Sequence, residues 1–193
     1  MNFKKFLKFV LTLPKCLMGG VRYKRGLYIG VGAKIVSRNN VILGSDVSVM
    51  PYSMIVAHPS SKIEIGKGST ISMFSRIGSK GYIKLGEYVE MGPNVIILDY
   101  NHEYRDVTKP IKLQGVSFKK KVNETPNVEI CDGAWIGAHV SIIGNVRIGK
   151  NSVIGANSVV TKDIPDYSVA TGIPAKVIKR YNFETQKWEK LNN

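Results

Sequence analysis

The sequence predicts an all-β protein whose main domain is a parallel β-helix, a coil of short strands joined by turns. Two observations support this prediction. Aliphatic residues recur every six positions along much of the chain, and small or β-branched residues recur four positions after many of them. A six-residue period fits neither an α-helix nor a simple alternating strand, whereas it suits short flat faces that stack coil upon coil. An open β-sandwich would show period-two alternation instead, and that alternation is absent here.

The repeat predicts which side chains fill the interior of the coil. Inward aliphatic residues are expected at Ile130, Ile136, Ile142, Ile148, Ile154 and Val160, and the small or branched series at Ala134, Val140, Val146, Ser152 and Ser158. The same period appears upstream at Ile29, Ile35, Val41, Val47, Ile65, Ile71, Ile77, Leu85, Met91 and Ile97, with slips near 51–62 and Ile83. Residues 26–170 are therefore assigned to the coil. Neighbouring strands about 4.8 Å apart would give roughly six coils.

The two ends of the chain differ from the coil. Residues 1–25 hold seven Lys or Arg and no acidic residue, and their apolar residues recur at helical spacing as far as Pro14. This pattern predicts a short basic amphipathic helical segment that either packs on the body or contacts an anionic membrane surface. Residues 171–193 form a C-terminal tail that is expected to cover the last coil or to lie along its side.

The formal net charge of +14 indicates anionic partners or ligands. No nucleic-acid-binding motif accompanies this charge, so nucleic acid is not an expected partner. No apolar run reaches the length of about 20 residues that a transmembrane helix needs. The two cysteines, Cys16 and Cys131, form neither a disulfide framework nor a zinc motif, which fits a cytoplasmic protein.

The six-residue period stops between residues 99 and 127, and this break is predicted to be a loop that leaves the coil. Pro110, Pro126 and a lysine run at 119–121 are incompatible with continued repeats. Long loops on rigid scaffolds often carry function, and this one contains His102. A neutral imidazole can accept the proton of an attacking hydroxyl group.

The other candidate nucleophiles and bases are expected to have structural roles. His58 precedes a proline in a predicted surface turn, and His139 should face outward because it follows inward Ile136 by three positions. Cys131 follows inward Ile130 directly, and no histidine lies near it in sequence. Covalent catalysis through cysteine is therefore not expected.

Three stretches resemble the bacterial hexapeptide-repeat acyltransferases: "IGANSVVTKDIPDYSVATGIPAKVIKR", "MGPNVIIL" and "DYNHEYRDVTKPI". Within that family the chain is most similar to sugar and polysaccharide O-acetyltransferases, to which the ending "KRYNFETQKWEK" contributes. The resemblance implies a left-handed coil. It also implies a homotrimer with active sites between subunits, acetyl-CoA as the acyl donor, and a hydroxyl or amine as the acceptor.

The resemblance also assigns roles to residues around the break. His102 corresponds to the general base that the loop carries to the next subunit, and Asn94 to the position whose amide contacts the acceptor near that base. Asp99 is a candidate to orient His102, and Glu103 is an alternative for the same role. Asn101, Tyr100 and Glu103 are candidates to bind the acceptor.

The donor site is expected on the later coils. The pantetheine arm of coenzyme A needs a groove without bulky side chains, and its phosphates need cations. The candidate donor-binding residues are Trp135, Ala138, Gly155, Ala156, Thr161, Lys162, Lys176, Lys179 and Arg180.

Together these features predict an acetyl-CoA-dependent O-acetyltransferase that modifies a sugar hydroxyl in cell-surface polysaccharide biosynthesis. The expected protein is trimeric and cytoplasmic, with peripheral contact to the inner face of the membrane, and it needs no metal. One alternative is an acyltransferase of the same fold that acts on a nucleotide-linked amino sugar or a drug. A β-helix metalloenzyme would need three histidine ligands, and the chain has only three histidines. A non-catalytic basic trimer that binds an acidic glycan is the third alternative.

Overall fold

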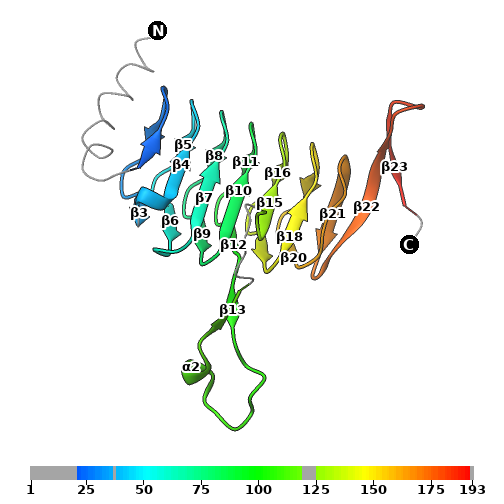
Figure 1. Ribbon diagram of the computed structural model, residues 1–193. Coiled ribbons are helices and arrows are strands. Elements are labelled where there is room, and N and C mark those ends of the chain that lie inside the picture. The colour runs from blue at the N-terminus through cyan, green and yellow to red at the C-terminus, as the bar shows by residue number, and fades with distance from the viewer. Residues whose placement is uncertain (1–20, 37, 119–124, 192–193) are drawn as a thin grey trace.

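A computed structural model describes residues 21–36, 38–118 and 125–191. The chain forms a parallel β-solenoid in which three sheets run along the length of a prism (Figure 1). The all-β, coiled fold predicted from the six-residue repeat is therefore confirmed. The predicted helical segment at the N-terminus falls mostly on residues 1–20, which lie outside the described residues.

Each of the first six coils contributes one strand to each of three sheets, here called A, B and C, and the last coil adds one strand to sheet B. Sheet A contains β1 (Arg22–Tyr23), β4 (Val41–Leu43), β7 (Lys62–Ile65), β10 (Tyr82–Leu85), β15 (Val128–Ile130) and β18 (Val146–Ile148). Sheet B contains β2 (Tyr28–Ile29), β5 (Ser48–Val49), β8 (Thr70–Ile71), β11 (Glu90–Met91), β16 (Trp135–Ile136), β19 (Val153–Ile154) and β21 (Ser168–Gly172). Sheet C contains β3 (Lys34–Val36), β6 (Met54–Ala57), β9 (Arg76–Ser79), β12 (Ile96–Leu98), β17 (Ser141–Ile143) and β20 (Val159–Val160).

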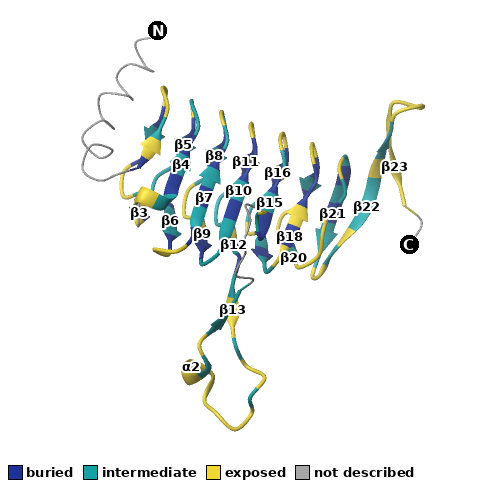
Figure 2. Ribbon diagram, in the orientation of Figure 1, coloured by how far each residue is buried: buried dark blue, intermediate teal, exposed yellow. Residues whose placement is uncertain are grey.

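The interior is filled by the aliphatic residues that define the repeat. The six residues from Ile130 to Val160 in the inward series are completely buried (Figure 2). The small series between them, from Ala134 to Ser158, is buried as well. Aliphatic residues of neighbouring coils lie in register and stack on one another. Ile83, for example, pairs with Val128. Full burial of one such side chain contributes about 1.5–3 kcal/mol, so the repeat itself supplies most of the driving force for the fold.

Two of the three corners of the prism are tight turns. The first corner joins sheet A to sheet B, and the second joins sheet B to sheet C. One residue of each turn has a positive φ, as at Asp46 and Asn94. Asparagine, aspartate and glycine tolerate this conformation best, which explains their recurrence along the sequence.

The third corner joins sheet C to the next strand of sheet A, and its length varies. The short helix η1 (Arg38–Asn40) lies in its first turn. Strands β6, β7, β9 and β10 that flank its next two turns have four residues each, which accounts for the slips in the repeat. The predicted loop leaves from this corner after β12. It contains β13 (Asn101–His102), α2 (Ile111–Gln114) and β14 (Val116–Ser117) (Figure 1).

The C-terminal tail continues sheet B instead of folding back along the prism. Strands β22 (Ala175–Asn182) and β23 (Lys187–Lys190) add to β21 in antiparallel order. Ala175 and Val177 pack against the core, so the start of the tail covers part of the last coil. Within the described ranges, no helix has both the length and the apolar character that crossing a membrane requires.

Candidate functional site

Asp99 fixes the base of the extruded loop. Its carboxylate is buried and accepts hydrogen bonds from Ser79 Oγ (2.7 Å) and from the backbone N–H groups of Lys80 (2.8 Å) and Gly81 (3.0 Å). These three donors lie in the turn of the preceding coil. Both carboxylate oxygens are bonded to that turn, and the role of Asp99 in orienting His102 stays a prediction.

His102 lies at the start of the loop, on a short two-stranded hairpin. Strand β13 pairs antiparallel with β14, with His102 opposite Val116. The backbone N–H of His102 donates to Asn101 Oδ1 (2.9 Å), and its imidazole is exposed. Glu103, the second candidate to orient the histidine, instead pairs with Arg105 at 3.0 Å. Among the described residues, no carboxylate orients the imidazole of His102.

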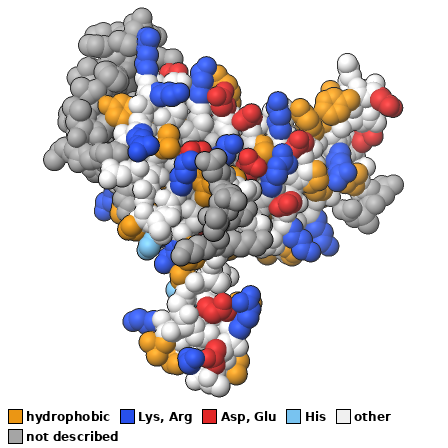
Figure 3. Space-filling model, in the orientation of Figure 1, with side chains coloured by type: hydrophobic (Ala, Val, Ile, Leu, Met, Phe, Trp, Pro, Cys, Tyr) orange, Lys and Arg blue, Asp and Glu red, His pale blue; other side chains and the backbone are white. Residues whose placement is uncertain are grey.

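The outer part of the loop has its own polar framework. Gln114 Nε2 donates to the carbonyl oxygens of Asp106 (2.7 Å) and Lys109 (2.8 Å), and the Asp106 N–H donates to Gln114 Oε1 (3.1 Å). Hydrogen bonds from the Lys109 ammonium and the Thr108 hydroxyl lower the pKa of Asp106. The loop stands off the prism and carries both hydrophobic and charged side chains on its surface (Figure 3). It is thus an ordered extension rather than part of the core.

Asn94 occupies the second corner, one coil before His139. It has φ 59°, and its backbone N–H donates to the carbonyl of Met73 (3.0 Å) in the previous coil. The His139 N–H donates in turn to Pro93 O (2.9 Å). The side-chain amide of Asn94 is half-buried and forms no hydrogen bond with another described residue. It is therefore available to a ligand.

Several predicted donor-binding residues lie on sheet B and at the second corner. Trp135 is 53% exposed on β16 and stands in register with Val153, Val169 and Lys179. Paired residues share one face of a sheet, so these four side chains form an outer row. Successive strands lie about 4.8 Å apart, which places Lys179 roughly 14 Å from Trp135.

The row next to Trp135, toward the second corner, holds small residues. Its members are Gly92, Gly137, Gly155 and Thr171, followed by Lys176 on β22. A Cβ added to Gly137 would come within 2.6 Å of the backbone nitrogen of Ala156, so close coil packing itself requires glycine there. Packing and ligand access therefore favour the same residues. The row is a suitable track for an extended pantetheine arm, with a cation at its end.

The remaining predicted donor residues do not join this track within one chain. Thr161 and Lys162 are exposed at the third corner, across sheet C from Ala138 and Ala156. Arg180 pairs with buried Ser168 and so points to the opposite face of β22 from Lys179. The structure thus brings together Asn94, Ala138, Gly155, Ala156, Trp135, Lys176 and Lys179, and it leaves His102, Thr161, Lys162 and Arg180 apart from them.

The other histidines and the cysteine lie where the repeat places them. His58 is at the third corner, where Nδ1 contacts Ser60 Oγ at 3.0 Å, and His139 is exposed at the second corner. Burial raises the pKa of the Cys131 thiol, which disfavours the nucleophilic thiolate. In the part of the chain that the structure describes, no three His, Cys, Asp or Glu side chains form a group that could hold a metal ion.

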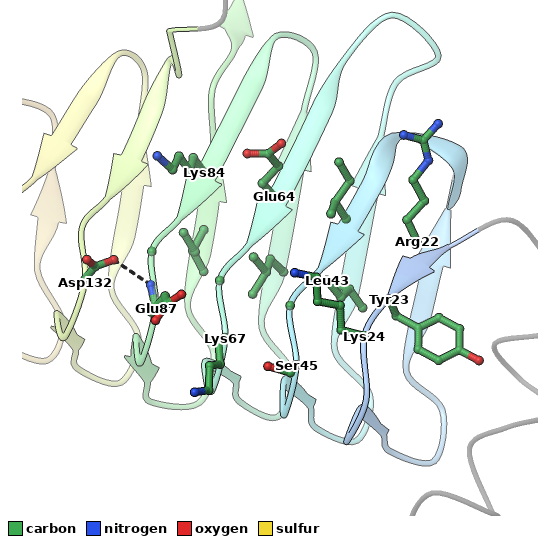
Figure 4. A pocket seen from close by; sticks show the side chains of 16 residues that line it. Arg22, Tyr23, Lys24, Leu43, Ser45, Glu64, Lys67, Lys84, Glu87 and Asp132 are labelled. Atoms are coloured by element: carbon green, nitrogen blue, oxygen red, sulfur yellow. Dashed lines mark hydrogen bonds between the residues drawn. The ribbon is translucent and has the colours of Figure 1, made fainter.

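A broad open groove of about 690 Å³ lies on the outer face of sheet A and along the first corner (Figure 4). Basic residues line it, including Arg22 and Lys84, but acidic residues such as Glu64 and Asp132 lie among them. Although burial opposes the shift, hydrogen bonds from Lys62 and Tyr82 lower the pKa of Glu64. None of the predicted site residues lines this groove. Its mixed charge argues against it as the reaction centre.

An aromatic pair at the second corner is not among the predicted site residues. Phe74 stands one coil and Tyr52 two coils before Asn94, and their rings stack with centroids 5.5 Å apart. The signal was present, because each follows an inward aliphatic residue by three positions, as Asn94 follows Met91. The role of Asp99 had no such signal, since its partners are backbone groups of another coil.

The comparisons with known proteins agree with this architecture. The family model "Bacterial transferase hexapeptide (six repeats)" matches residues 127–162. A probable acetyltransferase of Mycobacterium tuberculosis is 31% identical over 91% of this chain and 55% of its own length. Residues 127–162 thus match the hexapeptide-repeat transferase model, and most of the chain is similar to a relative named as a probable acetyltransferase.

Two further comparisons concern a curated relative and a solved structure. Galactoside O-acetyltransferase of Escherichia coli is 36% identical over 63% of this chain and 56% of its own length. The chain spans about half the length of the curated relatives it matches. The solved N-acyltransferase AntD of Bacillus cereus, in complex with dTDP-4-amino-4,6-dideoxyglucose and coenzyme A, has a TM-score of 0.74 over 90% of both chains. At 21% identity this likeness establishes the fold alone.

Proposed function

We propose that this chain is an acetyl-CoA-dependent O-acetyltransferase that modifies a sugar hydroxyl in cell-surface polysaccharide biosynthesis, and that it works as a homotrimer. The observation that carries the proposal is the separation of His102 from the other site residues. Asn94 and the donor track lie on one corner of the prism, whereas His102 stands on a loop that leaves a different corner. A second copy would complete the site by bringing its loop to this corner.

The surface of the loop supports this arrangement. Val107 is 93% exposed, and Tyr104, Ile111 and Leu113 are also exposed. A projecting loop with several exposed apolar residues is unfavourable in an isolated chain and favourable against a neighbouring copy. The outer face of sheet C offers an apolar surface of its own, with Val36 and Ile96 exposed.

The proposed chemistry is direct transfer. The imidazole of His102 takes the proton of the acceptor hydroxyl as that oxygen attacks the thioester carbonyl carbon of acetyl-CoA. The Asn94 amide positions the acceptor, and a backbone N–H stabilises the negative charge that develops on the carbonyl oxygen. The carbon–sulfur bond then breaks, and the imidazolium returns the proton to the departing thiolate.

Oxygen is favoured over nitrogen as the acceptor atom by the more similar relatives. The galactoside O-acetyltransferase of Lactococcus lactis is 45% identical over 52% of this chain, and a protein of Escherichia coli provisionally named as a lipopolysaccharide biosynthesis O-acetyl transferase is 33% identical over 62%. Amine acylation is the second candidate, because AntD is named an N-acyltransferase and PerB of Caulobacter crescentus was solved with coenzyme A and GDP-perosamine. Those structures share only about a fifth of their residues with this chain.

Calorimetric titration with acetyl-CoA at moderate salt, with ADP as the control anion, tests the donor. Salt is needed because a chain with a formal charge of +14 attracts any anion. Micromolar binding of acetyl-CoA that is clearly tighter than ADP is expected. Equal binding of the two would remove the transferase proposal and favour a non-catalytic glycan-binding protein. Sedimentation velocity then tests the trimer, which an active monomer would contradict.

A further inference from the structure

Tyr52 and Phe74 occupy the second corner in line with Asn94, and both have an unfavourable backbone conformation. Their φ angles are 58° and 59°, in the left-handed region that bulky side chains avoid. Each residue is 57% exposed. Asparagine suits the same position, as Asn94 and Asn157 show. An exposed aromatic residue with a strained backbone is a reason to look for a ligand.

The packing of the two rings leaves one aromatic face open. The ring planes of Tyr52 and Phe74 are nearly parallel, at 5°, with centroids 5.5 Å apart. The Cδ1–Cε1 side of the Tyr52 ring lies against Gly32 of the preceding coil, since a Cβ on Gly32 would come 2.5 Å from a carbon of that ring. Among the described residues, Phe74 has a ring contact only with Tyr52. The face of Phe74 away from Tyr52, toward the coil of Asn94, therefore carries no ring contact.

The spacing of the coils allows one ring to bind beyond Phe74, at a position here called the slot. The next residue in the column is Asn94, whose side chain is short, and His139 follows one coil later. Two coil spacings place the Phe74 and His139 positions about 10 Å apart. A ring stacked between two others needs two centroid spacings of about 4.5–7 Å each, so one ring fits. The free amide of Asn94 forms the floor.

We propose that one pyranose ring of the acceptor binds in this slot, stacked on Phe74, with its hydroxyl groups hydrogen-bonded to Asn94. A pyranose suits it because the ring has an apolar C–H face and a polar rim, which match an aromatic wall and an amide floor. This inference rests on the proposed function and adds the acceptor subsite to it. The donor track runs from Lys176 toward Gly92, so the two substrates approach Asn94 from opposite ends of the prism.

The test compares Phe74→Asn with a matched control, Tyr88→Asn. Tyr88 has the same exposure of 57% and a φ of 55°, and it lies against Gly68, but it stands on the first corner. Asn151 occupies a corresponding place on that corner, so asparagine is tolerated there too. Each variant removes one exposed ring at a comparable backbone position.

The readouts are saturation-transfer NMR titration with the methyl pyranosides of galactose, glucose, N-acetylglucosamine and rhamnose, and acetyl transfer to whichever pyranoside binds. Phe74→Asn is expected to weaken pyranoside binding and kcat/KM for the sugar on the order of tenfold. KM for acetyl-CoA should stay unchanged. Tyr88→Asn should leave both values at the wild-type level.

The outcomes separate this inference from the proposed function. If Phe74→Asn binds the pyranoside as the wild type does, or if both variants lose it equally, the slot is wrong and the transferase proposal stands. If the wild type binds acetyl-CoA but none of the four pyranosides, the slot is likewise overturned. Dissociation of the oligomer in Phe74→Asn would show that a second copy, not a sugar, covers the ring. If acetyl-CoA itself does not bind, the proposed function fails, and the acceptor subsite fails with it.

Discussion

The prism and the loop are held together by different kinds of contact. In the prism, aliphatic side chains such as Ile130 and Ile136 are fully buried and stack coil upon coil. In the loop, no helical residue of α2 is buried, and order comes from polar contacts of Asp106 and Gln114. The comparison indicates that the prism supplies the stability and carries Asn94 and the proposed donor track, whereas the loop carries only the proposed general base.

The connection between the two regions is small. Asp99 joins the base of the loop to the turn at Ser79–Gly81 through three hydrogen bonds. The hairpin of β13 and β14 follows directly, and His102 lies on it. One buried carboxylate therefore determines where the proposed catalytic loop leaves the prism.

The largest effect is expected for a cavity in the prism. Ile142→Ala removes most of a fully buried side chain on β17 and should cost about 2–5 kcal/mol in the free energy of unfolding. Val107→Ala, at a loop residue that is 93% exposed, should change that free energy by less than about 0.5 kcal/mol. Urea denaturation of both variants measures the difference. Equal costs would contradict the division of roles between prism and loop.

The loop variant His102→Ala should lower activity and leave stability nearly unchanged. Loss of the general base is expected to lower kcat by at least about a hundredfold, while the exposed imidazole contributes little to stability. Steady-state kinetics of acetyl transfer and the thermal midpoint should be measured on the same preparation. A decrease of only a few-fold would remove His102 from the role of base.

Asp99→Asn weakens the contacts between the loop and the prism and should lower both stability and activity. An amide cannot accept all three hydrogen bonds, so at least one buried donor loses its partner at a cost of about 1–3 kcal/mol. The displaced loop should also lower kcat about tenfold. Asp106→Asn is the control, because the side chain of Asp106 bonds only within the loop. If Asp99→Asn keeps full stability but loses all activity, Asp99 acts on the reaction rather than on the loop.

The sequence was sufficient to predict the coil because each coil repeats the same interior. Ile136 and Ile154 occupy equivalent positions, so a residue that is misassigned in one repeat can be recognised from the equivalent residue in the next repeat. The break at residues 99–127 was equally visible, since Pro110 cannot continue the period. The tail was less predictable: β22 and β23 have no repeat, and their antiparallel addition to sheet B depends on pairing with β21.

The site could be predicted only in part, and the missing parts have a common physical cause. Repetition reveals which residues face inward or occupy a corner, so Asn94 and Ala138 could be placed at a corner. It does not reveal contacts between side chains and the backbone of another coil, which is why the hydrogen bonds of Asp99 to the turn at Ser79–Gly81 were not predicted. The Tyr52–Phe74 stack was missed for a related reason, since stacking depends on two adjacent corners carrying rings at once.

The smallest effect concerns acid pH and compares one carboxyl group from each region. The Lys150 N–H hydrogen bond, with Arg147 beside it, lowers the pKa of Asp166 in the prism, and Lys109 and Thr108 lower that of Asp106 in the loop. When a carboxyl group has a lower pKa in the folded than in the unfolded state, its ionised form stabilises the fold at pH values above the ordinary carboxyl pKa. This stabilisation is lost as the pH falls through the folded-state pKa. Asp166 is about half exposed, so Asp166→Asn should remove only about 0.5 kcal/mol of stability at neutral pH and reduce the loss of stability in acid.

Asp106→Asn should leave the free energy of global unfolding unchanged at every pH, because the loop can open without the prism. Urea midpoints between neutral and acid pH test this, and a shift in Asp106→Asn as large as that in Asp166→Asn would mean that the loop and prism unfold as one unit.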